Sequence, residues 1–438
     1  MSITCAPRRR RMSLALAIAA SIGTVTEAVR AQDASPAPPR SDSERVRDQR
    51  WREDLDALWT GLRDSHPAPL GGVTADERVA QVRAIDARIP TLTDDEIVVE
   101  FMRFTAAIGD DHTLVDSQIF AASRLPIVLV GWPDGVRLVR APAAHAKSIG
   151  QRLIRVGAFA IEDVLDELAR VQSMTPAWRV RMAPQLLPFA GLLAGMGLVE
   201  PGEPVPMTFA DDDGAETTIS LSPAPLPADA AGVKVLGDAV TNQRGALWHH
   251  AQWLADERIL YVQYNRCATS PEHDLDAFVG KLVDHVSQTD VAAIVFDLQY
   301  NGGGNSALGD AMFRRLAAHE PMRRKRGVYA LIGVGTFSSA LMNAMTLKAR
   351  HGAVLIGTDT GGAPDHFGEV RTFALPHSKV KVWHSTKRFG RADGKRTTLS
   401  PDVVAARTFA DFVAGRDPLL DAVRRHLKET AGAPADGK

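Results

Sequence analysis

Cysteine is almost absent from this chain. Its 438 residues include only Cys5 and Cys267, and Cys5 falls in an amino-terminal segment that we expect to be removed. One remaining thiol cannot form an internal disulfide, so the mature fold must rely on noncovalent contacts even in an oxidising compartment. Because Cys267 follows the strand-like run 258–265, we interpret it as a small packing residue.

Long apolar runs, an excess of one charge and metal-binding motifs are also lacking. Beyond the amino terminus no segment approaches eighteen apolar residues, so we expect no stable membrane insertion of the mature chain. Lysine and arginine number 51 against 52 aspartate and glutamate residues, which gives no indication of a nucleic-acid partner. HExxH, CxxC and a strand-linked GxGxxG do not occur, and no P-loop lysine follows the glycines at 302–304. We therefore expect neither a metal nor another cofactor.

The chain begins with what looks like an export signal. A basic start at 8–11 precedes the apolar run 12–25, which is too short to span a bilayer, and the small residues at 28–31 fit a cleavage site. We predict a signal peptide at 1–31 and an exported protein, periplasmic or secreted. Its removal would change the net charge from −1 to −5, because five arginines and one glutamate leave with it.

The signal is followed by three regions with different hydrophobic periodicity. A proline-, serine- and alanine-rich lead-in at 32–44 is expected to be disordered. From 45 to 118, apolar residues recur at every third or fourth position, which predicts a helical N-terminal region. From 125 to 225, short alternating runs predict a small β domain with an apolar, helical insert at 176–198.

The β domain resembles a PDZ-like domain, a module that usually grips a peptide end by adding it to a sheet edge. The acidic turn 211–213 between two strand-like runs predicts one of its hairpins. Gln151 follows Gly150 where the PDZ-like pattern commonly has a Gly-Asp pair. A small β domain of another kind remains the alternative.

From 245 to 425, strand-like and helix-like runs alternate. The run 291–298 is apolar except for Asp297, as in a strand buried on both faces. A helical pattern at 307–317, a strand at 328–334 and a helix at 339–350 follow. This rhythm predicts an α/β core with largely parallel strands, and the fold class is therefore multidomain α/β. The tail at 429–438 is predicted to be flexible.

Polar segments follow two successive strands of this core. The first is Asp297–Asn305, with three consecutive glycines, and the second is Thr336–Ala340. Ligands of α/β sheets bind where the carboxyl ends of strands meet. Ser338 and Ser339 stand where a helix starts, so either could be a helix cap. Alternatively, one is a nucleophile whose oxyanion is stabilised by free N–H groups at the helix start.

Taken together, these segments resemble the tail-specific (C-terminal processing) serine peptidase family. Its members carry Asp-Leu-Arg-x-Asn-x-Gly-Gly and Thr-x-Ser-x-Ala, matched here by Asp297–Gly304 and Thr336–Ala340. The resemblance implies a ClpP/crotonase-like core with Ser338 as nucleophile. It also implies an oxyanion hole made by the N–H of Ser339 and an N–H of Gly303 or Gly304.

The base that many members use is missing. They carry lysine in Gly-x-x-Thr-x-Gly-Lys, whereas this chain has Ala363 in the lysine position. Lys348 lies ten residues along the helix from Ser338, roughly 15 Å at the helical rise, and His351 is farther still. Proton transfer needs about 3 Å, so neither can be the base unless the helix breaks.

A histidine is therefore the expected base, since its pKa suits a serine hydroxyl near neutrality. His112, in Gly109–Thr113, resembles the Asp-x-His-[Ser/Thr] of the tricorn-like branch, which has a Ser-His site instead of Ser-Lys. His366, on the loop that normally bears the lysine, is the alternative base. For the group that orients the imidazole, Glu369 and Asp365 are candidates, as is a backbone carbonyl. The branch pattern places a glutamate where this chain has Lys395.

The sequence thus predicts an exported serine-type peptidase that forms an acyl-enzyme. Its partner would be a polypeptide, either an unfolded segment or a C-terminal end. Two other hypotheses remain: a catalytically inactive binding protein on the same scaffold, and a hydrolase of small esters or amides.

Overall fold

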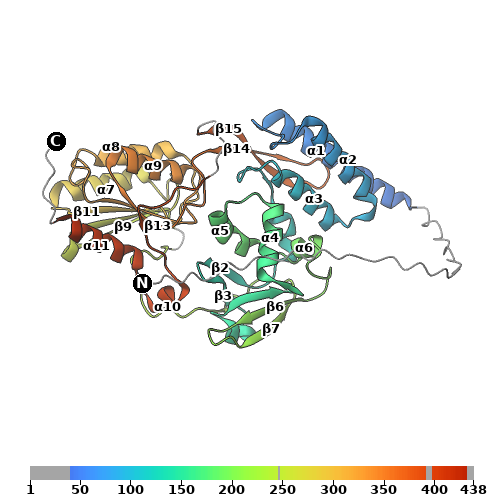
Figure 1. Ribbon diagram of the computed structural model, residues 1–438, viewed down its shortest axis with the longest axis horizontal. Helices are drawn as coiled ribbons and strands as arrows, with labels where there is room; N and C mark the ends of the chain where they lie inside the picture. Colours follow the sequence, from blue (N-terminus) through green and yellow to red (C-terminus); the bar gives the residue numbers. More distant parts are fainter. Residues whose placement is uncertain (1–39, 245–246, 391–396, 432–438) are drawn as a thin grey trace, which may run out of the picture. The chain divides into compact units, whose positions relative to one another are not determined.

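The computed structural model describes residues 40–244, 247–390 and 397–431. The predicted signal peptide, the first part of the lead-in, Lys395 and most of the predicted tail lie outside these ranges. Residues from Ser43 onward belong to one compact unit, whose helices and strands are drawn in Figure 1.

The described chain begins with three helices: α1 (Asp42–Ser65), α2 (Ala75–Arg88) and α3 (Asp94–Ala106), with a 3-10 turn η1 (Ile89–Thr91) before α3. Capping boxes start α2 and α3, because the Thr74 and Thr93 side chains accept from the backbone of Glu77 and Glu96 and these glutamates reach back. The predicted apolar stripe of α1 is buried at Leu55, Leu58 and Leu62.

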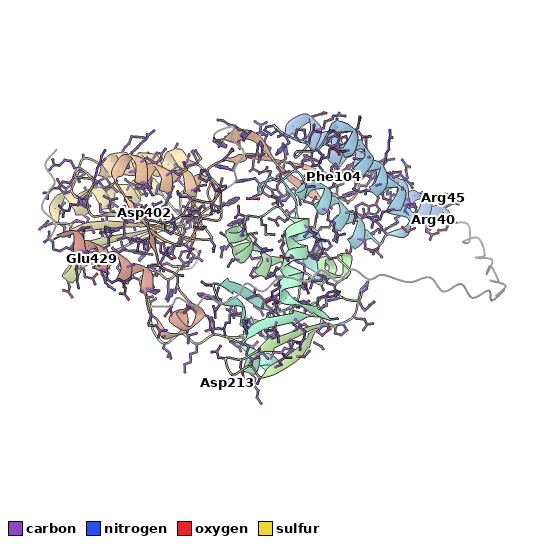
Figure 2. The ribbon with its side chains drawn as sticks, viewed as in Figure 1. Arg40, Arg45, Phe104, Asp213, Asp402 and Glu429 are labelled. Carbon is purple, nitrogen blue, oxygen red and sulfur yellow. The ribbon has the colours of Figure 1, made fainter. Side chains whose placement is uncertain are left out.

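The second region is a mainly antiparallel sheet with helices inserted. Its sheet order is β2-β3-β4-β6-β7, and β6 and β7 form the predicted hairpin, with Asp213 at its turn (Figure 2). The insert at 176–198 forms two helices, α5 and α6. The elements are β2 (Val128–Trp132), β3 (Gly135–Ala141), η3 (Ala143–Ser148), β4 (Arg152–Val156), β5 (Phe159–Ala160), α4 (Ile161–Val171), α5 (Pro176–Leu186), α6 (Ala190–Gly195), β6 (Val205–Ala210), β7 (Glu216–Leu221) and β8 (Ala231–Gly232).

The third region is a six-stranded sheet in the order β16-β13-β12-β11-β10-β9, parallel except for the β9–β10 pair. Every residue of β10, β11 and β12 is buried, because helices cover both faces: α7, α8 and α9 on one side and α11 on the other (Figure 1). The elements are β9 (His249–Leu254), η4 (Ala255–Glu257), β10 (Ile259–Tyr264), α7 (Leu275–Gln288), β11 (Ala293–Asp297), α8 (Ser306–Leu316), β12 (Val328–Ile332), α9 (Ser339–His351), β13 (Val354–Gly357), β16 (Val403–Val404), α10 (Phe409–Ala414) and α11 (Pro418–Ala431).

A long hairpin leaves this core and joins the helical region. Its strands, β14 (His366–Ala374) and β15 (Lys381–Phe389), pair with β1 (Leu114–Val115) in a separate three-stranded sheet; η2 (Ser117–Ser123) follows β1. Leu375, Val380 and Val382 bury their side chains with the apolar residues of α1 and α3. The hairpin thereby brings the segment just before β1, which contains His112, to the chain that follows β13.

Candidate active site

Ser338 lies immediately before α9 in an unusual backbone conformation. Its φ of 51° and ψ of −125° put a non-glycine residue in the left-handed half of the map, which costs energy and persists only where the surroundings enforce it. Ser338 occupies the N-cap position, but its side chain makes no capping hydrogen bond. The hydroxyl is thus not used as a helix cap, although Ser and Thr usually cap helices through that bond.

The loop that carries Ser338 is joined to the loop after β11 by buried hydrogen bonds. Thr336, fully buried, donates its hydroxyl to the Leu298 carbonyl at 2.9 Å and accepts from the Gly333 N–H at 3.1 Å. The Phe337 N–H donates to the Asn301 carbonyl at 3.0 Å. These bonds fix the backbone at the start of the NGGGN segment against the turn before Ser338.

Gly303 allows the two loops to touch at Ser338. Its φ is 108°, and a Cβ atom built on it would lie 2.7 Å from Ser338 Cβ and 3.0 Å from the Ser339 nitrogen. No side chain fits there, so only glycine permits this approach. Gly302, its neighbour, has no such constraint, because a Cβ built there meets no atom within 4 Å.

The backbone N–H groups around Ser338 are not equivalent. The Gly303 N–H donates to Asn301 Oδ1 at 2.9 Å. Within the described ranges, neither the Ser339 N–H nor the Gly304 N–H donates a hydrogen bond, while the Ser339 hydroxyl donates to the Gly304 carbonyl at 2.6 Å. Of the two glycines considered for an oxyanion hole, Gly304 therefore keeps an unused donor and Gly303 does not.

Lys348 and His351, the basic residues of α9 considered as a base, have other contacts. The helix runs without a break from Ser339 to His351, so Lys348 and His351 stay at its far end. Lys348 Nζ donates to Asp402 Oδ1 at 2.5 Å; Asp402 is labelled in Figure 2. The His351 ring lies 6.1 Å from the Phe313 ring.

The two candidate histidines are stacked on each other, and His112 lies against the residue that precedes Ser338. The His112 ring stacks on Phe337 with centroids 4.5 Å apart and planes at 28°. His366 stacks in turn on His112, at 5.8 Å and 23°. Among the described residues no hydrogen bond joins Ser338 Oγ to either ring. Catalytic hydrogen bonds are often long in unliganded enzymes, so this alone does not decide between the two histidines.

The loop with the missing lysine carries His366. A Cβ built on Gly362 would lie 3.4 Å from the Ser338 nitrogen and 3.3 Å from the Phe337 ring, so this loop packs on the serine turn. His366 Nδ1 donates to the Ala363 carbonyl at 2.8 Å, since a carbonyl can only accept. That bond leaves the lone pair of a neutral His366 ring on Nε2.

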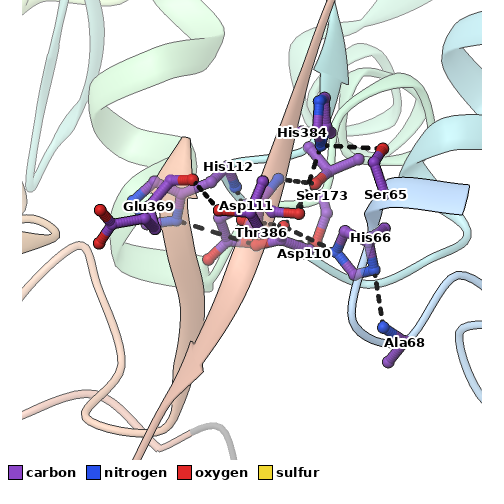
Figure 3. Close-up of polar contacts among 12 residues, drawn as sticks. Ser65, His66, Ala68, Asp110, Asp111, His112, Ser173, Glu369, His384 and Thr386 are labelled. Atoms are coloured by element: carbon purple, nitrogen blue, oxygen red, sulfur yellow. Dashed lines mark hydrogen bonds and ion pairs between the residues drawn. The ribbon is translucent and has the colours of Figure 1, made fainter. Parts of the chain in front are cut away.

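His112 is adjacent to a buried carboxylate that our sequence reasoning did not single out. Its Nδ1 lies 3.8 Å from Asp110 Oδ1, and its backbone N–H donates to the same oxygen at 3.1 Å. Figure 3 shows Asp110 between His112 and His66. Asp110 belongs to the same short motif as His112, so the motif itself was the available signal.

Asp110 is held as a charged group despite its burial. Its other oxygen accepts from His66 Nε2 at 3.2 Å, Thr113 Oγ1 at 2.5 Å and Ser385 Oγ at 2.6 Å. His66 Nδ1 accepts from the Ala68 N–H, which fixes Nε2 as the donor. Burial alone would raise the pKa of Asp110, but these bonds and the positive charge available on His112 outweigh it and keep the pKa well below its usual range.

Glu369 and Asp365, the two carboxylates predicted as orienting groups, have other partners. Glu369 is exposed on β14. Its carbonyl accepts from Thr386 Oγ1. Asp365 forms an ion pair with Arg388 at 2.9 Å. Asp110, by contrast, has a carboxylate oxygen 3.8 Å from a ring nitrogen of His112.

Helix α5 of the second region reaches the same place. The Trp178 ring stacks on the free face of Phe337, at 4.1 Å and 8°. Thr175, which caps α5, also donates its hydroxyl to the Gly361 carbonyl at 2.6 Å. The Phe337 ring is therefore packed between the Trp178 and His112 rings.

A second buried aspartate lies beneath the NGGGN segment. Asp297 accepts from the Tyr261 hydroxyl at 2.5 Å and from the Gln299 N–H at 2.9 Å. Burial is the largest influence and raises the pKa of Asp297 to about 6.

Cys267 is buried as predicted, and burial raises the pKa of its thiol to about 12. Such a thiol is protonated at neutral pH and is not a nucleophile.

The described residues contain neither a metal-ligand cluster nor a membrane-spanning helix. Within residues 40–244, 247–390 and 397–431, no three His, Cys, Asp or Glu side chains are grouped as metal ligands. None of the helices in those ranges has the length and apolarity needed to cross a membrane.

Comparison with known proteins gives a likeness of fold. No model of a protein family matches this sequence, and no curated protein matches it. Among solved structures, mature CPAF aligns with a TM-score of 0.62 at 14% identity, covering 89% of this chain and 99% of that chain. Mature CPAF complexed with lactacystin aligns with a TM-score of 0.61 at 13% identity, covering 88% and 99%. The chain therefore shares the mixed α/β fold of mature CPAF over most of its length.

Proposed function

We propose that this chain is an exported serine-type peptidase with Ser338 as its nucleophile. The observation that carries the proposal is the backbone at Ser338: a strained residue at a helix start whose hydroxyl is not used as a cap. Strain of this kind is typical of functional positions. The resemblance to tail-specific peptidases and the fold likeness to mature CPAF support the same interpretation.

In the proposed reaction, Ser338 Oγ attacks the carbonyl carbon of a peptide bond while His112 takes the hydroxyl proton. The carbonyl oxygen becomes an oxyanion, which the N–H groups of Ser339 and Gly304 would stabilise. His112 then gives the proton to the leaving amine, the C–N bond breaks, and an acyl-enzyme ester remains. Water, deprotonated by His112, hydrolyses that ester and restores Ser338.

His112 is favoured over His366 as the base because a negative charge lies beside it. Asp110 Oδ1 is 3.8 Å from His112 Nδ1, and a carboxylate there stabilises the imidazolium that forms when the base takes a proton. His366 Nδ1 instead faces the neutral Ala363 carbonyl. We propose that Asp110 fills the orienting role for which Glu369 and Asp365 were considered.

The proposed substrate is a polypeptide, either an unfolded segment or a C-terminal end. The second region, proposed to be PDZ-like, has β2 as an edge strand of its sheet, and an edge strand is where such modules add a peptide. Export to the periplasm or beyond is proposed from the signal-like residues 1–31.

The decisive experiment compares the wild-type protein with Ser338→Ala on unfolded casein and with a fluorophosphonate probe. We expect wild type to cleave casein and to be labelled at Ser338, and the variant to do neither while unfolding at the same temperature. A variant that cleaves casein as fast as wild type refutes the mechanism. Labelling without casein cleavage, but with turnover of short acyl esters, would favour a small-ester hydrolase; no labelling would favour a non-catalytic binding protein.

A further inference from the structure

The backbone around Gly304 is bonded on one side to Cys267, which follows β10. The Cys267 N–H donates to the Gly303 carbonyl at 3.0 Å, and the Asn305 N–H donates to the Cys267 carbonyl at 2.7 Å. These two bonds form a parallel bridge between Cys267 and Gly304. A Cβ built on Gly304 would lie 2.2 Å from the Cys267 carbonyl oxygen, so the two segments are in direct backbone contact.

The bridge determines the direction of the unused Gly304 N–H. The peptide group between Gly303 and Gly304 is trans, so its C=O and N–H point in opposite directions. Its C=O points at Cys267, and its N–H therefore points away from Cys267. The carbonyl of Gly304 itself also points to that other side, because the Asn305 N–H of the same peptide group is bonded to Cys267.

Helix α9 lies on the side to which Gly304 directs both groups. The Ser339 hydroxyl donates to the Gly304 carbonyl at 2.6 Å. A Cβ built on Gly303 would lie 2.7 Å from Ser338 Cβ, which puts the nucleophile on the same side of the loop. The first residue of α9 therefore holds the carbonyl of the residue whose N–H is proposed to stabilise the oxyanion.

A second side chain of α9 holds the end of the same loop. Asn343 is fully buried, and its Nδ2 donates to the Ser306 carbonyl at 2.9 Å and to Asp310 Oδ1 at 3.0 Å. A Cβ built on Gly309 would lie 2.4 Å from Asn343 Oδ1, so α8 and α9 are in close contact there. The helix that carries the nucleophile thus also fixes the start of α8, where the loop ends.

The glycines make the conformation between these fixed points changeable. Gly303 and Gly304 have φ of 108° and 133°, and glycine exchanges such conformations for others more freely than any other residue. Gly304 and Asn305 are also exposed, so water is available to replace a lost donor. Within the described chain, the Ser339 hydroxyl is the group that bonds to Gly304 itself, since Cys267 bonds to the residues before and after it.

From these contacts we infer that the Ser339 hydroxyl is a positioning group for the oxyanion hole. By holding the Gly304 carbonyl, it keeps the Gly304 N–H directed toward the place where the oxyanion forms. Ser339 then has two separable roles: its N–H stabilises the oxyanion, and its side chain orients the second donor. The pattern Thr-x-Ser-x-Ala accepts any residue at this position, so the resemblance does not imply the side-chain role. The inference rests on the proposed function.

The test replaces the hydroxyl and keeps the backbone donor. Ser339→Ala retains the N–H of residue 339 and removes the bond to the Gly304 carbonyl. We expect kcat on a fluorogenic peptide to fall by about tenfold to one hundredfold, less than for complete loss of an oxyanion donor, because the Gly304 N–H is displaced and not removed. KM should stay within about twofold, since the contact acts on the transition state.

Ser306→Ala is the matched control. It removes a hydroxyl from the same loop, and in the described part of the chain that hydroxyl makes no hydrogen bond. We expect kcat and KM of this variant to stay within about twofold of the wild-type values.

Amide hydrogen exchange of residues 301–306 measures the hold on the loop without any use of turnover. The Gly303 and Asn305 N–H groups are bonded to Asn301 and Cys267, so they exchange slowly while the loop is fixed. Their exchange should become faster in Ser339→Ala and stay unchanged in Ser306→Ala.

Three results overturn the inference: a Ser339→Ala protein with the kcat of wild type, an equal loss of kcat in Ser306→Ala, or a lowered kcat in Ser339→Ala with unchanged exchange of the loop. In each of these cases an active wild-type protein keeps the proposed function. A wild-type protein that neither cleaves peptides nor reacts with a fluorophosphonate overturns the proposed function and the inference together.

Discussion

The serine side and the histidine side of the candidate active site are built in different ways. Ser338, Gly303 and Gly304 come from two successive turns of one sheet, and backbone hydrogen bonds join those turns. His112 and His366 come from segments far apart in the chain and meet through stacked rings and the β14–β15 hairpin. The first side is fixed by neighbouring strands, the second by contacts between distant segments.

The two sides also keep buried carboxylates in different states. Asp297 lies beneath the serine side, where burial is the largest influence on its carboxyl group and raises its pKa to about 6. Asp110, on the histidine side, is buried too, but its donors and His112 hold the pKa well below the usual range. Asp110 therefore keeps its negative charge on the side where an imidazolium would form. The charge of Asp110, 3.8 Å from His112 Nδ1, is the physical basis for preferring His112 as the base.

The largest expected effect distinguishes the two histidines. His112→Asn should lower kcat/KM for peptide hydrolysis by about three orders of magnitude, in the range found for loss of a general base. His366→Asn should lower it by less than about tenfold, because that ring supports His112 by stacking at 5.8 Å. Initial rates on a fluorogenic peptide measure both. The reverse order of effects would assign the base to the other histidine.

The next effect tests the contact between the two turns on the serine side. Gly303→Ala should lower kcat by roughly one hundredfold, because its Cβ would collide with Ser338 and displace the Ser339 N–H. Gly302→Ala is the matched control, since a Cβ there meets no atom within 4 Å. Similar rates for the two variants would contradict the close approach described for Gly303.

Asp110→Asn should lower kcat/KM by about tenfold or more, because a unit charge at about 4 Å contributes on the order of 1 to 4 kcal/mol. The carboxylate favours protonated His112, so its removal lowers the pKa of that histidine. Since the reaction needs neutral His112, the acid limb of the pH–rate profile should move to lower pH. Asp111→Asn removes the charge of the neighbouring carboxylate and keeps an oxygen that can accept from the Ser173 hydroxyl, so it controls for local damage. An unshifted acid limb in Asp110→Asn would leave Asp110 a purely structural role.

The smallest effect on turnover is expected at Asp297, where stability is the better readout. The folded protein binds this proton more tightly than the unfolded chain, since the pKa is about 6 against an ordinary 3.8. Stability should therefore fall as pH rises from about 4 to about 6, by roughly 3 kcal/mol at about 1.4 kcal/mol per pKa unit. Asp297→Asn should lose this component, which urea unfolding of both proteins across that range measures. If the free energy of unfolding changed equally with pH in the two proteins, the raised pKa assigned to Asp297 would be contradicted.

The serine side could be predicted from the sequence because its determinants are local. The run 291–298 contains the buried strand β11, and the helix predicted to begin at Ser339 does begin there. Chain order then placed two polar turns at one sheet edge. The absence of a capping bond at Ser338 and the engagement of the Gly303 N–H by Asn301 needed coordinates, because both depend on dihedral angles.

The histidine side could be predicted only in part. His112 was proposed from its motif, and the structure places its ring against Phe337. The hairpin 366–389 was not anticipated as a departure from the core, because its pairing with β1 spans most of the chain. The neighbourhood of Asp110 depends on His66 and Ser385, which are remote in sequence. Periodicity and motifs carry no information on such contacts.

The central claim is that His112 activates Ser338, and the rate of Ser338 labelling by a fluorophosphonate tests it most directly because it needs no knowledge of the substrate. The rate would be measured against pH for the wild-type protein, His112→Asn and His366→Asn. We predict labelling that rises with a single ionisation in wild type, persists in His366→Asn and drops by about three orders of magnitude in His112→Asn. A His112→Asn protein that is labelled as fast as wild type would contradict the account.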